Sequence, residues 1–259
     1  SFNNYVDADA AWQLVCDFDD TACAIIKHTN PAGAATGAAA AEAYRRALAC
    51  DPVSAFGGII GLNKKVDGQT AQAIADSGFM ECVIAPSFSP AAFKILSQKK
   101  NLRLIVCDPG SLQQDAFDFR KIHGGLLLQN RDVEVLRPNE MRVVTKRKPT
   151  KAQIQAMLFG WEVIKTVKSN AIIFVKGKQT VGIGCGQTSR VESVRIAVKQ
   201  AGKKASGAVM VSDAFLPKTD NVQLAAKAGI AAIIQTGGSI ADKEVIKAAD
   251  QHKIAMVMT

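Results

Sequence analysis

The sequence predicts an α/β protein of two similar lobes, each a mainly parallel sheet flanked by helices. Short apolar runs alternate with amphipathic, often alanine-rich stretches, an alternation typical of parallel strands joined by helices. From residues 54 and 207 onward, each half gives strand, short helix ending in glycine, strand, helix and strand. We interpret this order as a duplication of elements and expect the lobes at residues 1–145 and 146–259, with a cleft between them.

In the first half, capping and breaking residues mark where elements begin and end. Ser89 and Pro90 are an N-cap and a first-turn residue, and Asp51-Pro52 ends an alanine-rich helix. Asn30-Pro31 followed by Gly33 is typical of a turn. Residues 108–149 are less regular. We expect helices at residues 7–17, 38–50, 67–78 and 89–99, and strands at residues 24–26, 54–62, 80–86, 101–108 and 124–130.

The second half begins with a charged, proline-marked linker at residues 146–151. Thr150 and Gln153 form a capping box for a long helix that follows. A hairpin around Gly177 comes next. We expect its strands at residues 171–175 and 179–184, further strands at residues 207–213, 230–236 and 253–258, and helices at residues 189–201, 220–229 and 242–253.

Composition limits the classes of partner and compartment. The formal net charge of +9 favours an anionic partner, nucleic acid or a phosphorylated small molecule, unless the surface is merely basic. Only 6% of residues are aromatic, so base stacking on a nucleic-acid platform is poorly supported. Six cysteines without a CxxC pair suit reduced thiols in a cytoplasm better than a disulfide framework.

The apolar runs of the sequence and its two ends bear on whether the chain spans a membrane, carries a signal peptide or is a whole protein. No apolar run reaches the roughly 20 residues of a membrane span, and no signal peptide opens the chain. The sequence starts with Ser1 and stops at Thr259, just after an apolar run. We therefore expect a piece of a longer protein.

Lys27 and His28 are the first candidates for chemistry. They directly follow a short apolar strand, and in open α/β sheets ligands bind at the carboxyl ends of strands. They can act on a ligand there, or they can be a solvated lysine and an ordinary strand-end histidine. Gly57-Gly58, in the next expected strand, lets the backbone approach a neighbouring strand or a ligand.

Polar segments also lie at the junctions of the second half. The glycine string at residues 182–190 is G-x-G-x-G, which is not the dinucleotide fingerprint. Free N–H groups at the start of the following helix favour an anion, and Arg190 adds a fixed charge. The alternative is a tight turn with a surface arginine. Asn170, where a long helix meets a strand, can dock a ligand carbonyl or cap the backbone.

Two further loops precede helices in this half. One carries Asp213, Phe215 and Asp220, of which Asp220 can bind a ligand or simply cap the next helix. The other is a glycine turn with Ser239 and Asp242 as potential caps.

Several reaction classes lack their motifs in this sequence. The three histidines are scattered and no zinc-deaminase signature is present, so zinc is not expected. A serine-hydrolase elbow and a P-loop are also absent, which leaves serine hydrolysis and ATP chemistry without support.

Seven segments of the chain carry a resemblance to a known family: residues 27–33, 54–60, 83–96, 167–172, 182–190, 212–221 and 237–246. They resemble the AICAR transformylase domain, of the bacterial type, of the bifunctional purine-biosynthesis enzyme that also contains IMP cyclohydrolase. They occur in the order that the family has them and span nearly the whole chain. The resemblance implies two cytidine-deaminase-like lobes without zinc, and the cyclohydrolase domain is lacking.

The resemblance implies formyl transfer from 10-formyltetrahydrofolate to the 5-amino group of AICAR, giving FAICAR and tetrahydrofolate. His28 matches the family's proton acceptor, Lys27 its oxyanion-stabilising cation, and Asn170 a further catalytic residue. Adjacent residues on a strand point to opposite faces. Lys27 and His28 therefore reach one site only if the strand ends at or before His28, which the expected turn at Asn30-Pro31 favours.

Binding residues are implied by the same motif matching. Those for AICAR are His28, Gly57, Glu81, Arg190 and Phe215, and those for folate are Asn170, Val191, Asp220, Ser239 and Ile240. Ser169 and Asp213 are similar to two ligands of a structural monovalent cation, expected to be potassium. The family also implies a homodimer with its sites near the subunit interface, native fusion to an IMP cyclohydrolase domain, and no nucleic-acid or membrane partner.

The sequence departs from the family in three places. Leu216 and Lys218 stand where the family usually has aromatic residues. A phosphate-gripping L-R-Y-G-x-N-P segment would precede Ser1, and an R-H-F segment would follow Thr259. Two alternatives therefore stay open. One is a truncated or diverged piece that keeps the fold and dimer contacts but binds substrate poorly, and the other is a binding module for phosphorylated ligands.

Overall fold

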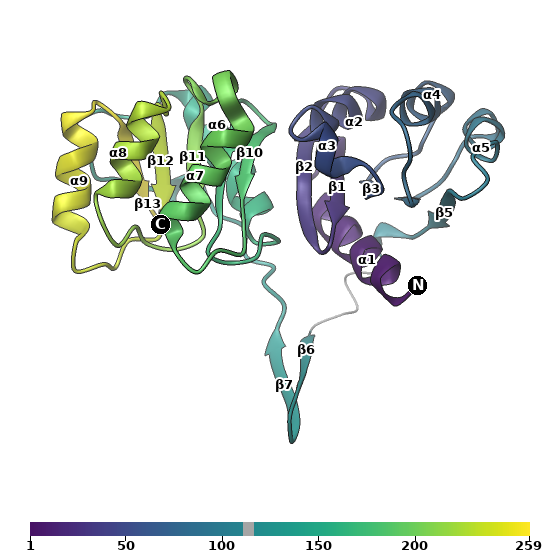
Figure 1. Ribbon diagram of the computed structural model, residues 1–259, viewed down its shortest axis with the longest axis horizontal. Helices are drawn as coiled ribbons and strands as arrows, with labels where there is room; N and C mark the ends of the chain where they lie inside the picture. The colour runs from purple at the N-terminus through teal and green to yellow at the C-terminus, as the bar shows by residue number, and fades with distance from the viewer. Residues whose placement is uncertain (111–116) are drawn as a thin grey trace.

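The computed structural model describes residues 1–110 and 117–259. Two helix-flanked sheets lie side by side in it, with the chain passing from one to the other through a projecting hairpin (Figure 1). One sheet has five strands in the order β2-β1-β3-β4-β5, and the other has six in the order β10-β9-β11-β12-β13-β8. The expected α/β class is thus confirmed.

The first sheet and its helices come from the N-terminal part of the chain. Its strands are β1 (Ala22–Lys27), β2 (Asn30–Thr36), β3 (Ile59–Leu62), β4 (Cys82–Ala85) and β5 (Arg103–Val106), and its helices are α1 (Phe2–Cys16), α2 (Ala40–Leu48), α3 (Pro52–Ala55), α4 (Gly68–Asp76) and α5 (Pro90–Leu96).

The second sheet takes its elements from the C-terminal part. Its strands are β8 (Arg142–Val143), β9 (Ile172–Val175), β10 (Thr180–Gly184), β11 (Val209–Ser212), β12 (Ala232–Gln235) and β13 (Ala255–Met258), and its helices are α6 (Lys151–Ile164), α7 (Arg190–Ala201), α8 (Asp220–Lys227) and α9 (Asp242–Gln251), with single 3-10 turns at Pro138–Glu140 and Gly202–Ala205.

The two sheets repeat one topology. In the first, β1 is antiparallel to β2 and β3, and β3, β4 and β5 are parallel. In the second, β9 is antiparallel to β10 and β11, and β11, β12 and β13 are parallel. The short β8 adds an antiparallel edge beside β13, so residues 142–143 belong to the second sheet although they precede the expected boundary after residue 145. That boundary stays a prediction.

The strands that carry the first candidates differ from expectation. Asn30, Pro31 and Gly33 lie in β2, and the turn is formed by His28 and Thr29. Both turn residues have positive φ, 53° and 63°, as a tight two-residue hairpin requires. Proline is tolerated because β2 is an edge strand of its sheet. A Cβ at Gly33 would lie 2.1 Å from the carbonyl oxygen of Ala47, so this glycine permits close packing on α2.

The first helix and the strand expected at residues 54–62 begin at other residues than expected. The first helix begins at Phe2, where Ser1 Oγ accepts from the Asn4 N–H at 3.3 Å. Residues 52–55 form α3, capped by Asp51, and β3 begins only at Ile59. The capping box of Thr150 and Gln153 is present as expected.

The region expected to be less regular contains a hairpin. Its strands are β6 (Phe117–Ile122) and β7 (Gly125–Asn130), and it projects away from both lobes (Figure 1). Residues 111–116 lie outside the described part of the chain. The cross-strand register places the exposed side chains of Phe117, Phe119, Leu126 and Leu128 on one face.

A shared core and a short ladder join the lobes. One apolar cluster combines Trp12 and Leu14 of α1 with Met157 and Val163 of α6. At the edges, the Thr36 N–H donates to the Lys178 carbonyl at 3.0 Å, extending pairing from β2 to the β9–β10 hairpin. The lobes are therefore held together by both packing and backbone hydrogen bonds. Among the described residues, no helix has the length and apolar character needed to cross a membrane.

Candidate active site

The His28 turn is held from two sides. The Asp7 carboxylate accepts from the His28 N–H at 3.0 Å and from the Thr29 N–H at 2.7 Å. The Asn30 amide nitrogen donates to the His28 carbonyl at 3.0 Å. Strand β1 ends at Lys27, so it ends before His28, as is required if both side chains are to reach one site. The turn that ends it is formed by His28 and Thr29 instead of the expected Asn30-Pro31.

Lys27 lies with the expected AICAR-side residues of the first lobe. Its Nζ donates to the Phe56 carbonyl at 2.7 Å, next to Gly57. Gly57 has φ of 72°, and its N–H donates to the Phe79 carbonyl at 2.8 Å. Glu81 is close by, because its N–H donates to the Gly58 carbonyl at 3.0 Å. The Glu81 carboxylate accepts from Arg103 at 2.6 Å.

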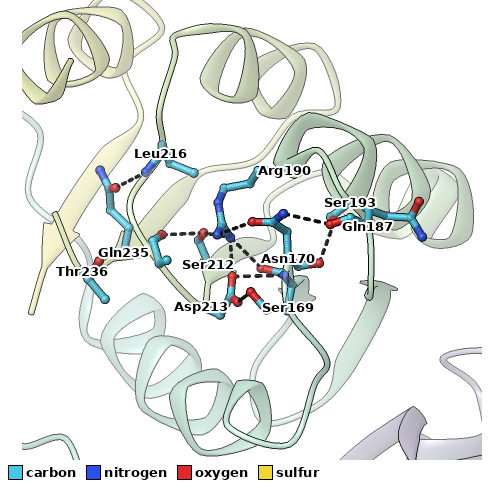
Figure 2. Close-up of polar contacts among 12 residues, drawn as sticks. Ser169, Asn170, Gln187, Arg190, Ser193, Ser212, Asp213, Leu216, Gln235 and Thr236 are labelled. Carbon is cyan, nitrogen blue, oxygen red and sulfur yellow. Dashed lines mark hydrogen bonds and ion pairs between the residues drawn. The ribbon is translucent and has the colours of Figure 1, made fainter. Parts of the chain in front are cut away.

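Arg190 organises the polar residues of the second lobe (Figure 2). It is the first residue of α7 and is only 8% exposed. Its Nη1 bonds to the Asp213 carboxylate and to Ser212 Oγ at 3.0 Å, while Nη2 donates to Asn170 Oδ1 at 2.7 Å. A buried guanidinium is stable only when it is paired and hydrogen-bonded in this way. The alternative of a surface arginine is therefore wrong.

The orientation of Asn170 is set by partners on both sides of its amide. Its Oδ1 accepts from Arg190, and its Nδ2 donates to the Gln187 carbonyl at 2.8 Å. Its own carbonyl accepts from Ser193 Oγ at 2.8 Å (Figure 2). The peptide bond between Ser169 and Asn170 is cis. These bonds hold Asn170 in the segment just before β9.

The glycines before α7 serve packing. A Cβ at Gly184 would lie 1.9 Å from the Ser193 carbonyl oxygen, and a Cβ at Gly182 would lie 2.4 Å from that of Ala197. Both glycines belong to β10, which packs directly on α7. Their place in the string is explained by this close approach, without an anion.

Most of the expected second-lobe residues line two cavities. One has a volume of about 470 Å³, and its lining includes Asn170, Arg190, Val191, Phe215 and Asp220. The other has a volume of about 570 Å³, and its lining includes Phe215, Ser239 and Ile240. Phe215 and Pro217 line both, so the two cavities adjoin. The sequence segments that supply them are far apart along the chain.

The loop residues that were expected to cap helices, Asp220, Ser239 and Asp242, do not occupy the N-cap position. Thr219 is the N-cap of α8, and Asp220 is its first residue. Asp220 Oδ1 accepts from both the N–H and the Nδ2 of Asn221 at 2.7 Å. Ser239 Oγ accepts from the Ala241 N–H at 3.1 Å, and Asp242 Oδ2 accepts from the Gly238 N–H at 2.8 Å.

Lys27 and His28 line neither of these two cavities. Their link to the second lobe is Asn30, whose Oδ1 accepts from the Lys168 N–H at 3.0 Å. Lys168 stands two residues before Asn170. The structure therefore connects the His28 turn to the Asn170 segment but does not place His28 among the residues that line the cavities.

Ser169 and Asp213, which are expected to bind a monovalent cation, lie next to each other, but their oxygen atoms already form hydrogen bonds within the protein. Ser169 Oγ donates to the Asp213 carboxylate, which also receives Arg190 and the Ala171 N–H at 3.1 Å. The guanidinium already neutralises Asp213, so a second cation there would compete with it. The potassium site stays a prediction. Within the described ranges, no cluster of three or more His, Cys, Asp or Glu could hold a metal.

The two departures from the family have different surroundings. Leu216 is fully buried, and its N–H donates to Gln235 Oε1 at 2.7 Å, so it is a core residue. Lys218 lines the cavity of about 470 Å³.

Sequence reasoning did not single out Asp7, Gln187 or Ser212. Gln187 lies inside the glycine string, but nothing local marks Asp7 as a partner of His28.

A comparison with protein families adds one finding. A family model described as "AICARFT/IMPCHase bienzyme" matches residues 1–200. The matched range includes Lys27, His28, Asn170 and Arg190, and it ends before Phe215.

Proposed function

Because the chain belongs to the AICARFT/IMPCHase bienzyme family, whose chemistry is that of purine biosynthesis, we propose that it is a formyltransferase. It transfers the formyl group of 10-formyltetrahydrofolate to the 5-amino group of AICAR and releases tetrahydrofolate and FAICAR. Beyond family membership, one observation carries the proposal: the Arg190 network holds Asn170 at a cavity that Phe215 and Asp220 also line.

The reaction needs a base and a cation. The AICAR amine is a poor nucleophile, since its lone pair is delocalised into the imidazole and carboxamide. As the new N–C bond forms, the amine loses a proton and the formyl oxygen gains negative charge. The bond to folate N10 then breaks, and N10 takes up a proton in place of the one that the amine lost. His28 takes the proton, which is typically worth about 10²–10⁴-fold in rate. Lys27 stabilises the oxyanion, and such a partner typically adds about 10²–10³-fold.

The hydrogen bond from Lys27 to Phe56 is compatible with this role. An ammonium has three donors, and this bond uses one. It also fixes the long side chain, so less conformational freedom is lost when the oxyanion forms. His28 is exposed at the tip of the β1–β2 hairpin, where a substrate amine can approach it.

The two adjoining cavities suit an elongated ligand with an aromatic end. Phe215 offers an apolar ring surface between them. Asp220 uses Oδ1 for Asn221, and Oδ2 accepts from the donor edge of a pterin. Ser239 and Ile240 extend the folate side, and the formal net charge of +9 favours a phosphorylated substrate such as AICAR.

The enzyme acts as a homodimer, natively fused to an IMP cyclohydrolase domain. The bienzyme description supports the fusion. An apolar face on the β6–β7 hairpin supports the dimer, because Phe119 is 64% exposed and Leu128 is 57% exposed. A second copy of this chain is the occupant that we propose for this face.

A catalytically weak piece is the second candidate. The observation that favours it is the position of Lys27 and His28 outside both second-lobe cavities. The two readings differ in turnover. Tetrahydrofolate release is followed with AICAR present and with AICAR omitted. AICAR-dependent release supports the formyltransferase, whereas folate and AICAR binding without release supports the weak piece. AICAR binding without folate binding would instead support a phosphate-binding module.

A further inference from the structure

The turn that carries His28 depends on a side chain from helix α1. Asp7 belongs to α1, and its carboxylate receives the N–H groups of His28 and Thr29, at 3.0 Å and 2.7 Å. The two residues are consecutive, and each donates to a different oxygen. Asp7 is thus bidentate toward the tip of the hairpin.

The conformation that Asp7 holds is an uncommon one. His28 has φ of 53° and Thr29 has φ of 63°, and both lie in the left-handed region that non-glycine residues seldom occupy. A β-branched residue such as Thr29 is especially disfavoured there. Hydrogen bonds to a carboxylate are stronger than those to a neutral acceptor, so Asp7 offsets the cost of this turn.

Asn30 determines where the turn lies relative to the second lobe. Its Nδ2 donates to the His28 carbonyl and its Oδ1 accepts from the Lys168 N–H, both at 3.0 Å. The two bonds define the orientation of the amide, because only the oxygen can accept and only the nitrogen can donate. Lys168 is itself anchored, since its carbonyl accepts from the Gly186 N–H at 2.7 Å. One side chain therefore spans from His28 to the segment that precedes Asn170.

We propose that Asp7 and Asn30 are positioning residues for His28. Asp7 holds the left-handed turn and so sets the direction of the imidazole relative to Lys27. Asn30 sets the distance of the turn from the Asn170 segment. The proposal rests on the proposed function, in which His28 is the base, but the hold that Asp7 exerts on the turn is measurable without any substrate.

The test compares Asp7→Ala and Asn30→Ala with the control Asp9→Ala. Asp9 lies on the same helix, and its carboxylate accepts from Gln13 of that helix at 2.7 Å. In Asp7→Ala we expect kcat to fall by about 10–100-fold with KM for AICAR and folate nearly unchanged, because small misplacements of a catalytic group cost up to about 10²-fold. Asn30→Ala is expected to behave likewise, and Asp9→Ala to stay near the unmutated enzyme.

Amide hydrogen exchange supplies a readout that does not need activity. In Asp7→Ala, the His28 and Thr29 amides should lose their protection while the strands of the sheet keep theirs. The double variant Asp7→Ala with Thr29→Gly should recover part of kcat, since glycine adopts the left-handed conformation without steric cost. A general defect in folding would not be rescued in this way.

The outcomes separate the two proposals. Unchanged kcat in Asp7→Ala, or unchanged exchange at His28 and Thr29, would overturn the positioning role. An increase in KM with kcat preserved would also overturn it. An unmutated chain without formyl transfer would instead sink the proposed function, and the exchange measurement would still decide whether Asp7 holds the turn.

Discussion

Arg190 and Asn170 are joined by a hydrogen bond of 2.7 Å between the guanidinium Nη2 and the amide Oδ1. Nη1 of the same guanidinium binds Asp213 and Ser212, so Arg190 uses its donors inside the protein. The motif resemblance implies an AICAR contact for this arginine. Its surroundings favour a supporting role, in which it fixes the amide that faces the cavity.

Removing Arg190 should therefore cost stability as well as activity. In Arg190→Gln, Asp213 loses its charged partner in a largely buried site, which typically costs about 3–5 kcal/mol. Urea unfolding measures the change. Arg195→Gln is the matched control, because Arg195 lies on the same helix in an exposed ion pair with Glu192 and should change stability by about 0.5 kcal/mol or less. Equal changes in the free energy of unfolding for the two substitutions would show that the buried network around Arg190 stabilises the fold no more than an exposed ion pair does.

The base assignment is best tested with His28→Asn. Asparagine tolerates positive φ, so the turn is retained while the imidazole is lost. We expect kcat for formyl transfer to fall by about 10²–10⁴-fold, the usual contribution of a general base. His252→Asn, at the end of α9, is the control and should leave kcat unchanged. Activity of His28→Asn close to that of the unmutated chain would remove His28 from the mechanism.

Lys27 should contribute through its charge. Lys27→Met keeps much of the side-chain length but removes the ammonium that faces the Phe56 carbonyl. The expected loss is about 10²–10³-fold in kcat, the range found for an oxyanion-stabilising group. Substrate binding, measured by calorimetry, should change much less. A loss confined to substrate binding would show that Lys27 binds the substrates but does not stabilise the oxyanion in the transition state.

The projecting hairpin should control oligomeric state. Leu128→Glu places a charge on the face that also carries Phe117, Phe119 and Leu126, and light scattering should then show a shift from dimer to monomer. Leu127→Glu is the control, because Leu127 pairs with Arg120 and points to the opposite face. A dimer that persists in Leu128→Glu, or a chain that is monomeric from the outset, contradicts the proposed interface.

Buried thiols should be unreactive in the native protein. Burial raises the pKa of Cys50 and the pKa of Cys82 from 9.0 to about 11. The folded state thus holds these protons more tightly than the unfolded state, so stability from this source is intact below pH 9 and falls as pH rises toward 11. Alkylation at pH 8, followed by mass spectrometry, should be far slower in the native chain than in urea. Rapid native labelling of either thiol would contradict this account.

The sequence alone determined the α/β class, the duplicated order of elements and the segments that resemble the transformylase family. These depend on local patterns: apolar runs of strand length, Ser89 and Pro90 at a helix start, and the capping box of Thr150 and Gln153. The hairpin around Gly177 was predicted for the same reason. Such signals lie within a few residues of the feature that they specify.

Tertiary structure decided what no local pattern expresses. The turn moved to His28 and Thr29 because Pro31 fits the edge strand β2, Gly33 packs against Ala47, and the Asp7 carboxylate on helix α1 accepts from the N–H groups of the turn. Arg190 became buried because Asp213 and Asn170, remote in sequence, offer partners for its charge. Pairing of groups distant along the chain depends on packing of the whole molecule, so the sequence named His28, Asn170 and Arg190 while only the fold assigned their contacts.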